Sequence, residues 1–238
     1  METEVLDNST GQYSVNVAMP QGEDVNETNH ESDRDAFMQN SSSCFTQKTW
    51  IKTERGEVGV RRLKVGDMVL TRDHGYQPIR WLGRRQSQPS DIETARELWP
   101  IIIKSYAFGP NSLHRQLVVS PTHRILLAGE HVQRQFGVEE ILVAAQDLTG
   151  MPGVRRIRPG NLDYVYFMFD QHEIVLSNGL WTESHQPDKP MVSTLTPDQQ
   201  ESLYRAFPNF KQPKGISDYL AARHTLAKAA AEALLSAS

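Results

Sequence analysis

Residues 44–72 read CFTQKTWIKTERGEVGVRRLKVGDMVLTR, and this stretch decides the fold. Its β-branched and apolar residues form two short runs, 49–53 and 58–63, separated by the turn residues Glu54-Arg55-Gly56-Glu57. Two such runs around a glycine-containing turn predict a β-hairpin. Gly66-Asp67 then supplies a second turn before a third run over 68–72. We therefore expect ordered β-structure to begin abruptly at Cys44.

The same β pattern continues to about residue 185. Short runs of β-branched and aromatic residues, broken by turn signals, predict further strands over 77–82, 100–106, 116–120, 123–128, 140–145, 164–170 and 173–176. Only 92–98 favours a short helix in this part of the chain. Many short strands without intervening long helices predict an all-β fold.

The periodicity changes after about residue 194. Thr196-Pro197-Asp198-Gln199 combines an N-cap threonine, a proline at the first helical position and a glutamine at the capping-box position. This predicts a helix over 199–207. Ser217 or Asp218 is a candidate cap for a second helix that runs through the alanine-rich stretch to about residue 235. We expect a C-terminal two-helix tail over 188–238.

The N-terminal segment, 1–43, differs in charge from the rest of the chain. Of the 29 acidic residues nine lie here beside a single base, Arg34, which leaves 20 acids and 24 bases in the remainder. The segment has no sustained apolar periodicity, so we expect a disordered acidic leader. The remainder is too weakly basic to favour nucleic acid as a partner.

The rest of the composition excludes several classes of protein. One cysteine in 238 residues rules out an intramolecular disulfide and a zinc site of several thiolates, and we expect no cofactor and no metal. No apolar run approaches the roughly 20 residues of a membrane span. The first residues lack the pattern of a secretory signal. We expect a cytoplasmic protein, or one exported without a cleaved signal peptide; the oligomeric state stays open.

Three sequence blocks carry candidate chemistry. The first contains Cys44, the strand around Ile51, the Gly56 turn and Gly66-Asp67. The second, residues 117–127, reads LVVSPTHRILL and places Ser120 three residues before His123. The third comprises VYFMFD over 165–170, His172, and SNGLWTES over 177–184.

In their order and spacing these blocks resemble the Hint (Hedgehog/intein) family, and they are most similar to bacterial Hint-type domains that begin with Cys-Phe-Thr and end with Trp-Thr-Glu-Ser. The resemblance implies a compact, horseshoe-like β fold over 44–187 that processes its own chain. The residues that it assigns to the site are Cys44 as nucleophile, Ser43 as its scissile-bond partner, His123, Ser120, Thr122, His172 and Asp170.

The chemistry fits these residue types. The Cys44 thiol can reach the Ser43 carbonyl through a five-membered ring and replace the amide by a thioester, a step that strain and proton donation promote. A histidine such as His123 suits the proton transfer because its pKa lies near neutral pH. Ser120 or Thr122 would bind the carbonyl or the imidazole. Asp170 would tune the thiol or activate an incoming nucleophile, and His172 would line the site.

One departure from inteins limits the reaction. Counting forward from Asn178-Gly179, Glu183 and Ser184 occupy the places of the final His-Asn pair. Serine has no side-chain amide to cyclise, so full splicing is not expected. The N-terminal half-reaction remains, with water, a small thiol, an amine or an alcohol as acyl acceptor.

Two other functions remain open. The chain could be a catalytically silent Hint fold that acts as a binding or structural module, with the leader and the tail as its contact surfaces. It could also be a cysteine hydrolase that acts on other substrates through Cys44 and His123, although no recognised peptidase motif surrounds Cys44.

Overall fold

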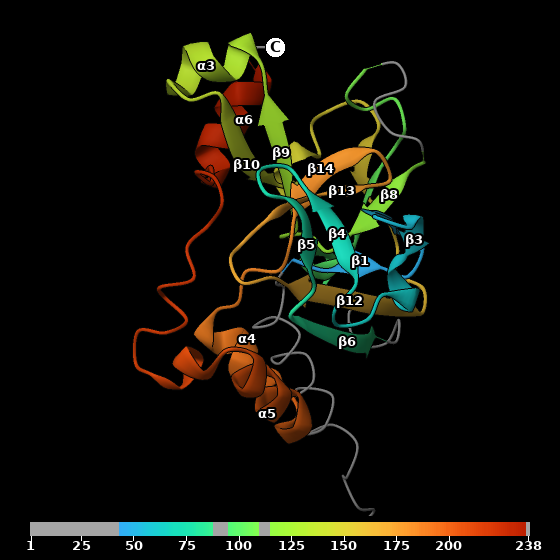
Figure 1. Ribbon diagram of the computed structural model, residues 1–238. Coiled ribbons are helices and arrows are strands. Elements are labelled where there is room, and N and C mark those ends of the chain that lie inside the picture. Colours follow the sequence, from blue (N-terminus) through green and yellow to red (C-terminus); the bar gives the residue numbers. More distant parts are fainter. Residues whose placement is uncertain (1–42, 88–94, 110–114, 237–238) are drawn as a thin grey trace, which may run out of the picture.

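The computed structural model describes residues 43–87, 95–109 and 115–236. This part of the chain is mainly antiparallel β-sheet with helices toward its C-terminal end, which confirms the predicted fold class (Figure 1). The expected disorder of the leader falls on residues outside the described ranges, Ser43 excepted. Of the helix expected over 92–98, only the 3-10 turn Arg96–Leu98 lies within them.

The first sheet has six strands and contains the start of the ordered chain. Its strand order is β11-β7-β8-β1-β12-β6. The strands are β1 (Phe45–Thr46), β6 (Trp81–Ser87), β7 (Ile101–Ile103), β8 (Leu117–Val119), β11 (Val154–Arg156) and β12 (Leu162–Met168). Two-residue β1 lies between β8 and β12, with Phe45 opposite both Val119 and Val165. This register places the residues just before β1 in the middle of the molecule.

The second sheet has eight strands, in the order β10-β9-β14-β13-β2-β4-β5 with β3 paired to β2. Its strands are β2 (Trp50–Thr53), β3 (Gly56–Gly59), β4 (Met68–Thr71), β5 (Gly75–Pro78), β9 (Arg124–Ala128), β10 (Glu140–Ala144), β13 (Ile174–Ser177) and β14 (Leu180–Glu183). The predicted hairpin at the start of the fold is β2–β3, with Thr53 opposite Gly56. The second strand is shorter than expected, since a 3-10 turn follows at Val60–Arg62.

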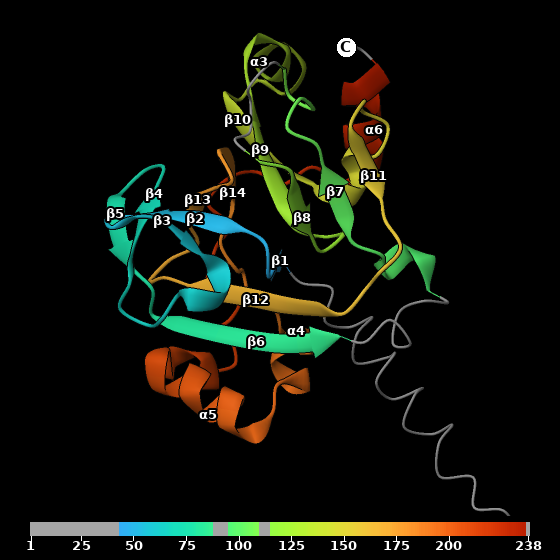
Figure 2. The same cartoon turned by 90° about the vertical axis from the view of Figure 1, so that its right-hand side faces the viewer.

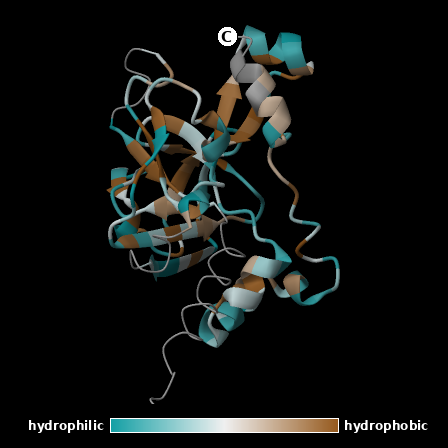
Figure 3. Ribbon diagram, turned by 180° about the vertical axis from the view of Figure 1, so that it is seen from behind, coloured by the Kyte–Doolittle hydropathy of each residue, from teal (hydrophilic) through white to brown (hydrophobic). Residues whose placement is uncertain are grey.

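Both sheets contribute to one apolar core. Phe45 and Phe167 of the first sheet and Ile51, Ile125 and Val175 of the second are almost completely buried in the same cluster. Figure 3 shows apolar strands inside the body, whereas the helices outside it are of mixed hydropathy. Burial of this apolar surface is the main term that stabilises the arrangement.

The turn between β13 and β14 fixes the end of the domain. Asn178 and Gly179 both have positive φ, 51° and 93°, as a two-residue hairpin turn requires. The Asn178 side chain also accepts a hydrogen bond from the Trp50 amide at 2.8 Å and donates one to the Gln116 carbonyl at 2.9 Å. One asparagine therefore ties three distant segments together.

The sequence predicted helix α5 of the tail but missed two short helices, one in the tail and one between β9 and β10. Helix α5 (Pro197–Ala206) has the predicted capping box, formed by Thr196 and Gln199. Helix α4 (Lys189–Thr194), capped by Asp188, was not predicted, and neither was α3 (Glu130–Phe136), a two-turn helix between β9 and β10. Both are short, so neither shows enough turns to establish a helical period.

The predicted second tail helix begins later than expected. Helix α6 spans Lys228–Ser236, whereas 217–226 is irregular chain. The Leu142 amide donates to the His224 carbonyl at 2.8 Å, and the Leu226 amide donates to the Leu142 carbonyl at 2.9 Å. Because pairing with β10 uses these backbone groups, the segment does not continue the helix.

A second apolar cluster joins the tail to the first sheet. Met191 of α4 and Leu203 of α5 pack in the same cluster as Trp81 of β6, Tyr166 of β12 and Cys44. In Figure 2, α4 and α5 lie beneath β6 and β12, on the outer side of the sheet. Among the described helices, none has the length and hydropathy that a membrane crossing requires.

Candidate functional site

The peptide bond between Ser43 and Cys44 is buried where β1 enters the first sheet. Both residues are 6% exposed. The Cys44 amide donates to Ser120 Oγ at 3.0 Å, and the Ser120 amide donates to the Cys44 carbonyl at 3.1 Å. Ser120 follows β8, the neighbour of β1, so the sheet register brings the first and second sequence blocks together at this bond.

The carbonyl side of the same bond faces the third block. His185 Nδ1 lies 3.3 Å from the Ser43 carbonyl oxygen, and Ser43 Oγ lies 3.5 Å from the Ser184 carbonyl oxygen. The His185 amide donates to the Phe167 carbonyl at 2.9 Å, which fixes the chain after β14. Since a carbonyl oxygen can only accept, Nδ1 carries the proton in this contact.

Sequence reasoning missed His185. Its signal was its place directly after Ser184, at the end of the third block. A histidine beyond the last recognised motif residue carries no pattern of its own, and only the folded chain shows that it reaches the Ser43 carbonyl.

His123 lies in the core rather than in a hydrogen bond to the scissile amide. It is completely buried, and neither ring nitrogen has a hydrogen-bond partner among the described residues. Its ring packs edge-on against Phe45 with centroids 4.5 Å apart. Burial lowers the pKa of His123 to about 4, because the opposing charge of Glu183 does not offset desolvation. The imidazole is therefore neutral at neutral pH.

The two predicted hydroxyl residues differ in what they contact. Ser120 Oγ accepts from the Cys44 amide instead of binding the Ser43 carbonyl or an imidazole. Thr122 is half-buried, and its hydroxyl has no hydrogen-bond partner in the described part of the chain.

His172 belongs to a buried polar cluster at the end of β14, together with Glu183 and Ser184. Its Nε2 lies 3.1 Å from the Ser184 carbonyl oxygen and 3.2 Å from Glu183 Oε2. Glu183 also accepts from the Arg124 amide at 2.8 Å and pairs with the Arg124 guanidinium at 3.2 Å. Burial works to raise the pKa of Glu183, but the hydrogen bond from His172 and the charge of Arg124 outweigh it, so this pKa lies below its ordinary value.

The structure does not bring Asp170 to the site. Its side chain is 68% exposed and pairs with Arg80 at the surface. Asp170 ends the run over 165–170 at the surface, whereas the buried carboxylate that contacts His172 is Glu183.

Two tyrosines of β12 lie on the thiol side of the bond. Burial and the proximity of Cys44 raise the pKa of Tyr164 and of Tyr166. The Tyr166 ring packs against His185 with centroids 5.1 Å apart. No group of three or more His, Cys, Asp or Glu side chains in the described ranges has an arrangement that would bind a metal ion.

A fold of two antiparallel sheets, in which three sequence blocks meet around a buried Ser-Cys bond, is that of a Hint-type domain. The model of the Hint domain family matches residues 43–189, and the chain belongs to this family. The match ends close to the start of α4, so α5, α6 and the segment between them lie outside it.

Several solved structures are similar to this chain at low identity. The gp41-1 intein is 12% identical, with a TM-score of 0.36 over 59% of this chain and 97% of its own. A bacterial intein-like domain from Clostridium thermocellum is 11% identical, with a TM-score of 0.38 over 59% and 97%. A DnaB intein from Synechocystis sp. PCC 6803 is 9% identical, with a TM-score of 0.37 over 60% and 99%. Likeness at this level says nothing about the chemistry of this chain. No curated protein matches the sequence.

Proposed function

We propose that the chain processes itself at the Ser43–Cys44 bond. The Cys44 sulfur attacks the Ser43 carbonyl carbon, a sulfur–carbon bond forms and the carbon–nitrogen bond breaks. The thiol proton passes to the departing nitrogen, which becomes the free amine of Cys44. Residues 1–43 are then held as a thioester that water, a small thiol, an amine or an alcohol releases.

The observation that carries this proposal is that side chains contact both ends of the buried bond. Ser120 Oγ accepts from the amide at 3.0 Å, and His185 Nδ1 lies 3.3 Å from the carbonyl oxygen. Attack by sulfur places negative charge on that oxygen, and a fixed N–H donor in a buried site stabilises the charge. His185 therefore acts as the oxyanion donor.

His123 is the group that carries the proton. It is neutral, and its ring nitrogens have no competing hydrogen bond to the described residues. It also contacts two residues that lie next to the bond, because its amide donates to the Ser120 carbonyl and its ring packs on Phe45. A neutral imidazole accepts the thiol proton and returns it to the amide nitrogen as that nitrogen leaves.

Intact-mass measurement of the full chain tests the proposal. We expect loss of residues 1–43, faster with an added thiol, and with hydroxylamine a leader that ends in a hydroxamate at Ser43. Cys44→Ala abolishes all of these products, whereas His131→Gln on exposed α3 leaves them unchanged. A leader that stays attached in the presence of thiol and of hydroxylamine overturns the proposal.

A second candidate is a silent Hint fold that serves as a binding module. The observations in its favour are the burial of Cys44, 6% exposed, and the absence of a hydrogen bond from His123 to the described residues. The same measurement separates the two candidates, because a silent domain keeps its leader and its Cys44 resists alkylation until the chain is unfolded.

A further inference from the structure

The segment between the two ends of the tail crosses the domain as a strap. We define the tail strap as residues 216–226; it lies beyond the family match and leads into α6. In Figure 1 it runs along the outside of the domain from the α5 end of the tail to α6. Its first anchor is Tyr219, which is buried and donates from its hydroxyl to the Phe169 carbonyl at 3.1 Å. Gln186 donates to the Tyr219 carbonyl at 3.1 Å.

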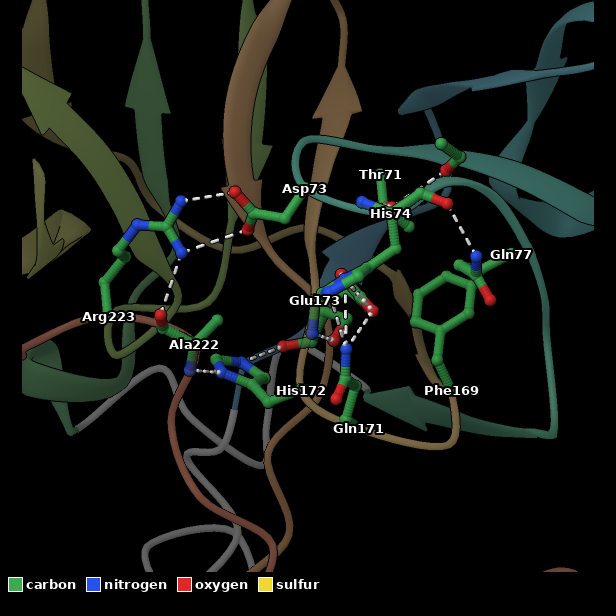
Figure 4. Close-up of polar contacts among 12 residues, drawn as sticks. Thr71, Asp73, His74, Gln77, Phe169, Gln171, His172, Glu173, Ala222 and Arg223 are labelled. Carbon is green, nitrogen blue, oxygen red and sulfur yellow. Dashed lines mark hydrogen bonds and ion pairs between the residues drawn. The ribbon is translucent and has the colours of Figure 1, made fainter.

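The second anchor is Arg223, which binds two carboxylates of the second sheet region. Its guanidinium lies 2.6 Å and 3.0 Å from the two Asp73 oxygens (Figure 4), and it also donates to Glu140 at 2.8 Å. The hydrogen bond from Arg223 lowers the pKa of Asp73. Two-carboxylate binding by a planar guanidinium is strongly directional, so it fixes the backbone on either side of residue 223.

Between these anchors the strap contacts His172. The Ala222 amide donates to His172 Nδ1 at 2.9 Å, and Figure 4 shows the ring lying between this amide and the domain. A ring nitrogen that accepts a hydrogen bond carries no proton. The neutral imidazole therefore has its proton on Nε2, the atom 3.1 Å from the Ser184 carbonyl oxygen.

Ser184 connects this histidine to the scissile bond. The carbonyl oxygen that His172 binds is also 3.5 Å from Ser43 Oγ. The next residue, His185, is the one whose Nδ1 reaches the Ser43 carbonyl. The orientation of the His172 ring thus fixes the segment that presents the oxyanion donor.

We infer that Ala222 is a positioning residue of the processing site: its backbone amide holds His172 Nδ1 while Nε2 faces the Ser184 carbonyl and the Glu183 carboxylate, and the tail strap thereby keeps Ser184-His185 against the Ser43–Cys44 bond. The tail is then a functional part of the domain rather than an appendage. The effect on processing rests on the proposed function, whereas the tautomer of His172 does not.

The first test measures the tautomer in the full chain carrying Cys44→Ala, which cannot process. The protein has eight histidines, and a His172→Gln variant identifies the His172 signals in proton–nitrogen correlation spectra of the imidazole rings. We expect the Nε2-protonated pattern for His172. A proton on Nδ1 overturns the inference, whatever the variants do.

The second test removes the amide donor. Ala222→Pro deletes the N–H, and we expect the Nδ1 signal in the His172 pattern to shift because this nitrogen loses its donor, while the proton stays on Nε2 beside its two acceptors. Ala221→Pro is the matched control, since the Ala221 amide makes no backbone hydrogen bond within the described residues; it leaves the pattern unchanged. If both prolines alter His172 equally, or neither does, the specific role of Ala222 is overturned.

The third test measures processing in chains that retain Cys44. Losing one hydrogen bond of this kind slows leader release roughly tenfold in Ala222→Pro and leaves Ala221→Pro at the parent rate. An unchanged rate despite a shifted His172 Nδ1 signal overturns the role of the strap in processing. If the parent chain releases no leader, the proposed function fails while the tautomer measurement still decides how Ala222 acts on His172.

Discussion

The histidines on the two sides of the candidate site differ in whether their ring nitrogens have hydrogen-bond partners. Around the scissile bond, both nitrogens of His123 and Nε2 of His185 are buried without a hydrogen-bond partner among the described residues. Around Ser184, both nitrogens of His172 have partners, one of them supplied by the tail strap. We call the first region the junction and the second the clamp.

This difference separates chemistry from support. A buried polar atom without a partner costs about 1–3 kcal/mol of stability, so a fold tolerates several of them together mainly where they serve a reaction. A buried network in which every member has a partner makes the local structure rigid. In the proposed mechanism, the junction contains the groups that transfer protons, and the clamp keeps them in place.

The largest expected effect concerns acid stability and comes from the junction. Burial lowers the pKa of both His123 and His185 to about 4, whereas the unfolded chain takes up these protons near pH 6.5. The contribution of these histidines to the free energy of unfolding is fully present above about pH 6.5. It is lost as the pH falls toward 4, by on the order of 3 kcal/mol for each histidine. The charge of Glu183 near each ring works to raise both pKa values, but desolvation outweighs it.

Urea unfolding of the Cys44→Ala chain at about pH 7.5 and about pH 5 measures this loss. His123→Phe removes one titrating group and makes the decrease smaller, whereas His131→Phe on exposed α3 leaves it unchanged. Equal unfolding midpoints at the two pH values would show that the junction histidines are not desolvated in solution.

The next largest effect lies in the clamp. Glu183→Gln keeps the size of the side chain but leaves Arg124 and His172 without their buried carboxylate. Breaking a buried ion pair by removing one partner lowers the free energy of unfolding by about 3–5 kcal/mol. Chemical denaturation at neutral pH measures this decrease in the free energy of unfolding.

Glu201→Gln is the matched control for that change. Glu201 pairs with Arg205 on α5, and both side chains are more than 70% exposed. The pair contributes less than about 0.5 kcal/mol, because solvent screens it. Similar losses in the two variants would mean that Glu183 is not the centre of a buried network.

The sequence predicted most of the strands and one end of the site, but it missed β11 and joined parts of β5 and β6 into one strand. Short β-branched runs and turn residues carry local signals, so the β2–β3 hairpin and the capping box of α5 could be located in advance. The motif order also pointed to Cys44 and Ser120, which the structure places in direct contact.

The missing parts depend on contacts between distant segments. Most of the tail strap, residues 217–226, has helical composition, but the strap pairs with Leu142 of β10, and no local pattern encodes that partner. Asp170 and Glu183 are both carboxylates near a histidine in sequence, yet the first is at the surface and the second is buried. Burial of a single side chain is set by the packing of the whole domain, so sequence spacing alone favoured the wrong member of this pair as a neighbour of the histidines.

The smallest expected effect is on the rate of processing and distinguishes an oxyanion donor from a packing residue. His185→Leu preserves an apolar volume against Tyr166 but removes the N–H that faces the Ser43 carbonyl oxygen. Loss of one such donor slows leader release by about a hundredfold, whereas His185→Gln, whose amide can still donate, recovers part of the rate. Time courses of intact mass compare the two variants with the parent chain. If Leu and Gln slow release equally, His185 acts only through packing, and the junction would then lack a side-chain donor for the developing oxyanion within the described residues. That result would place the chemical role of this region on His123 alone and make His185 part of the clamp.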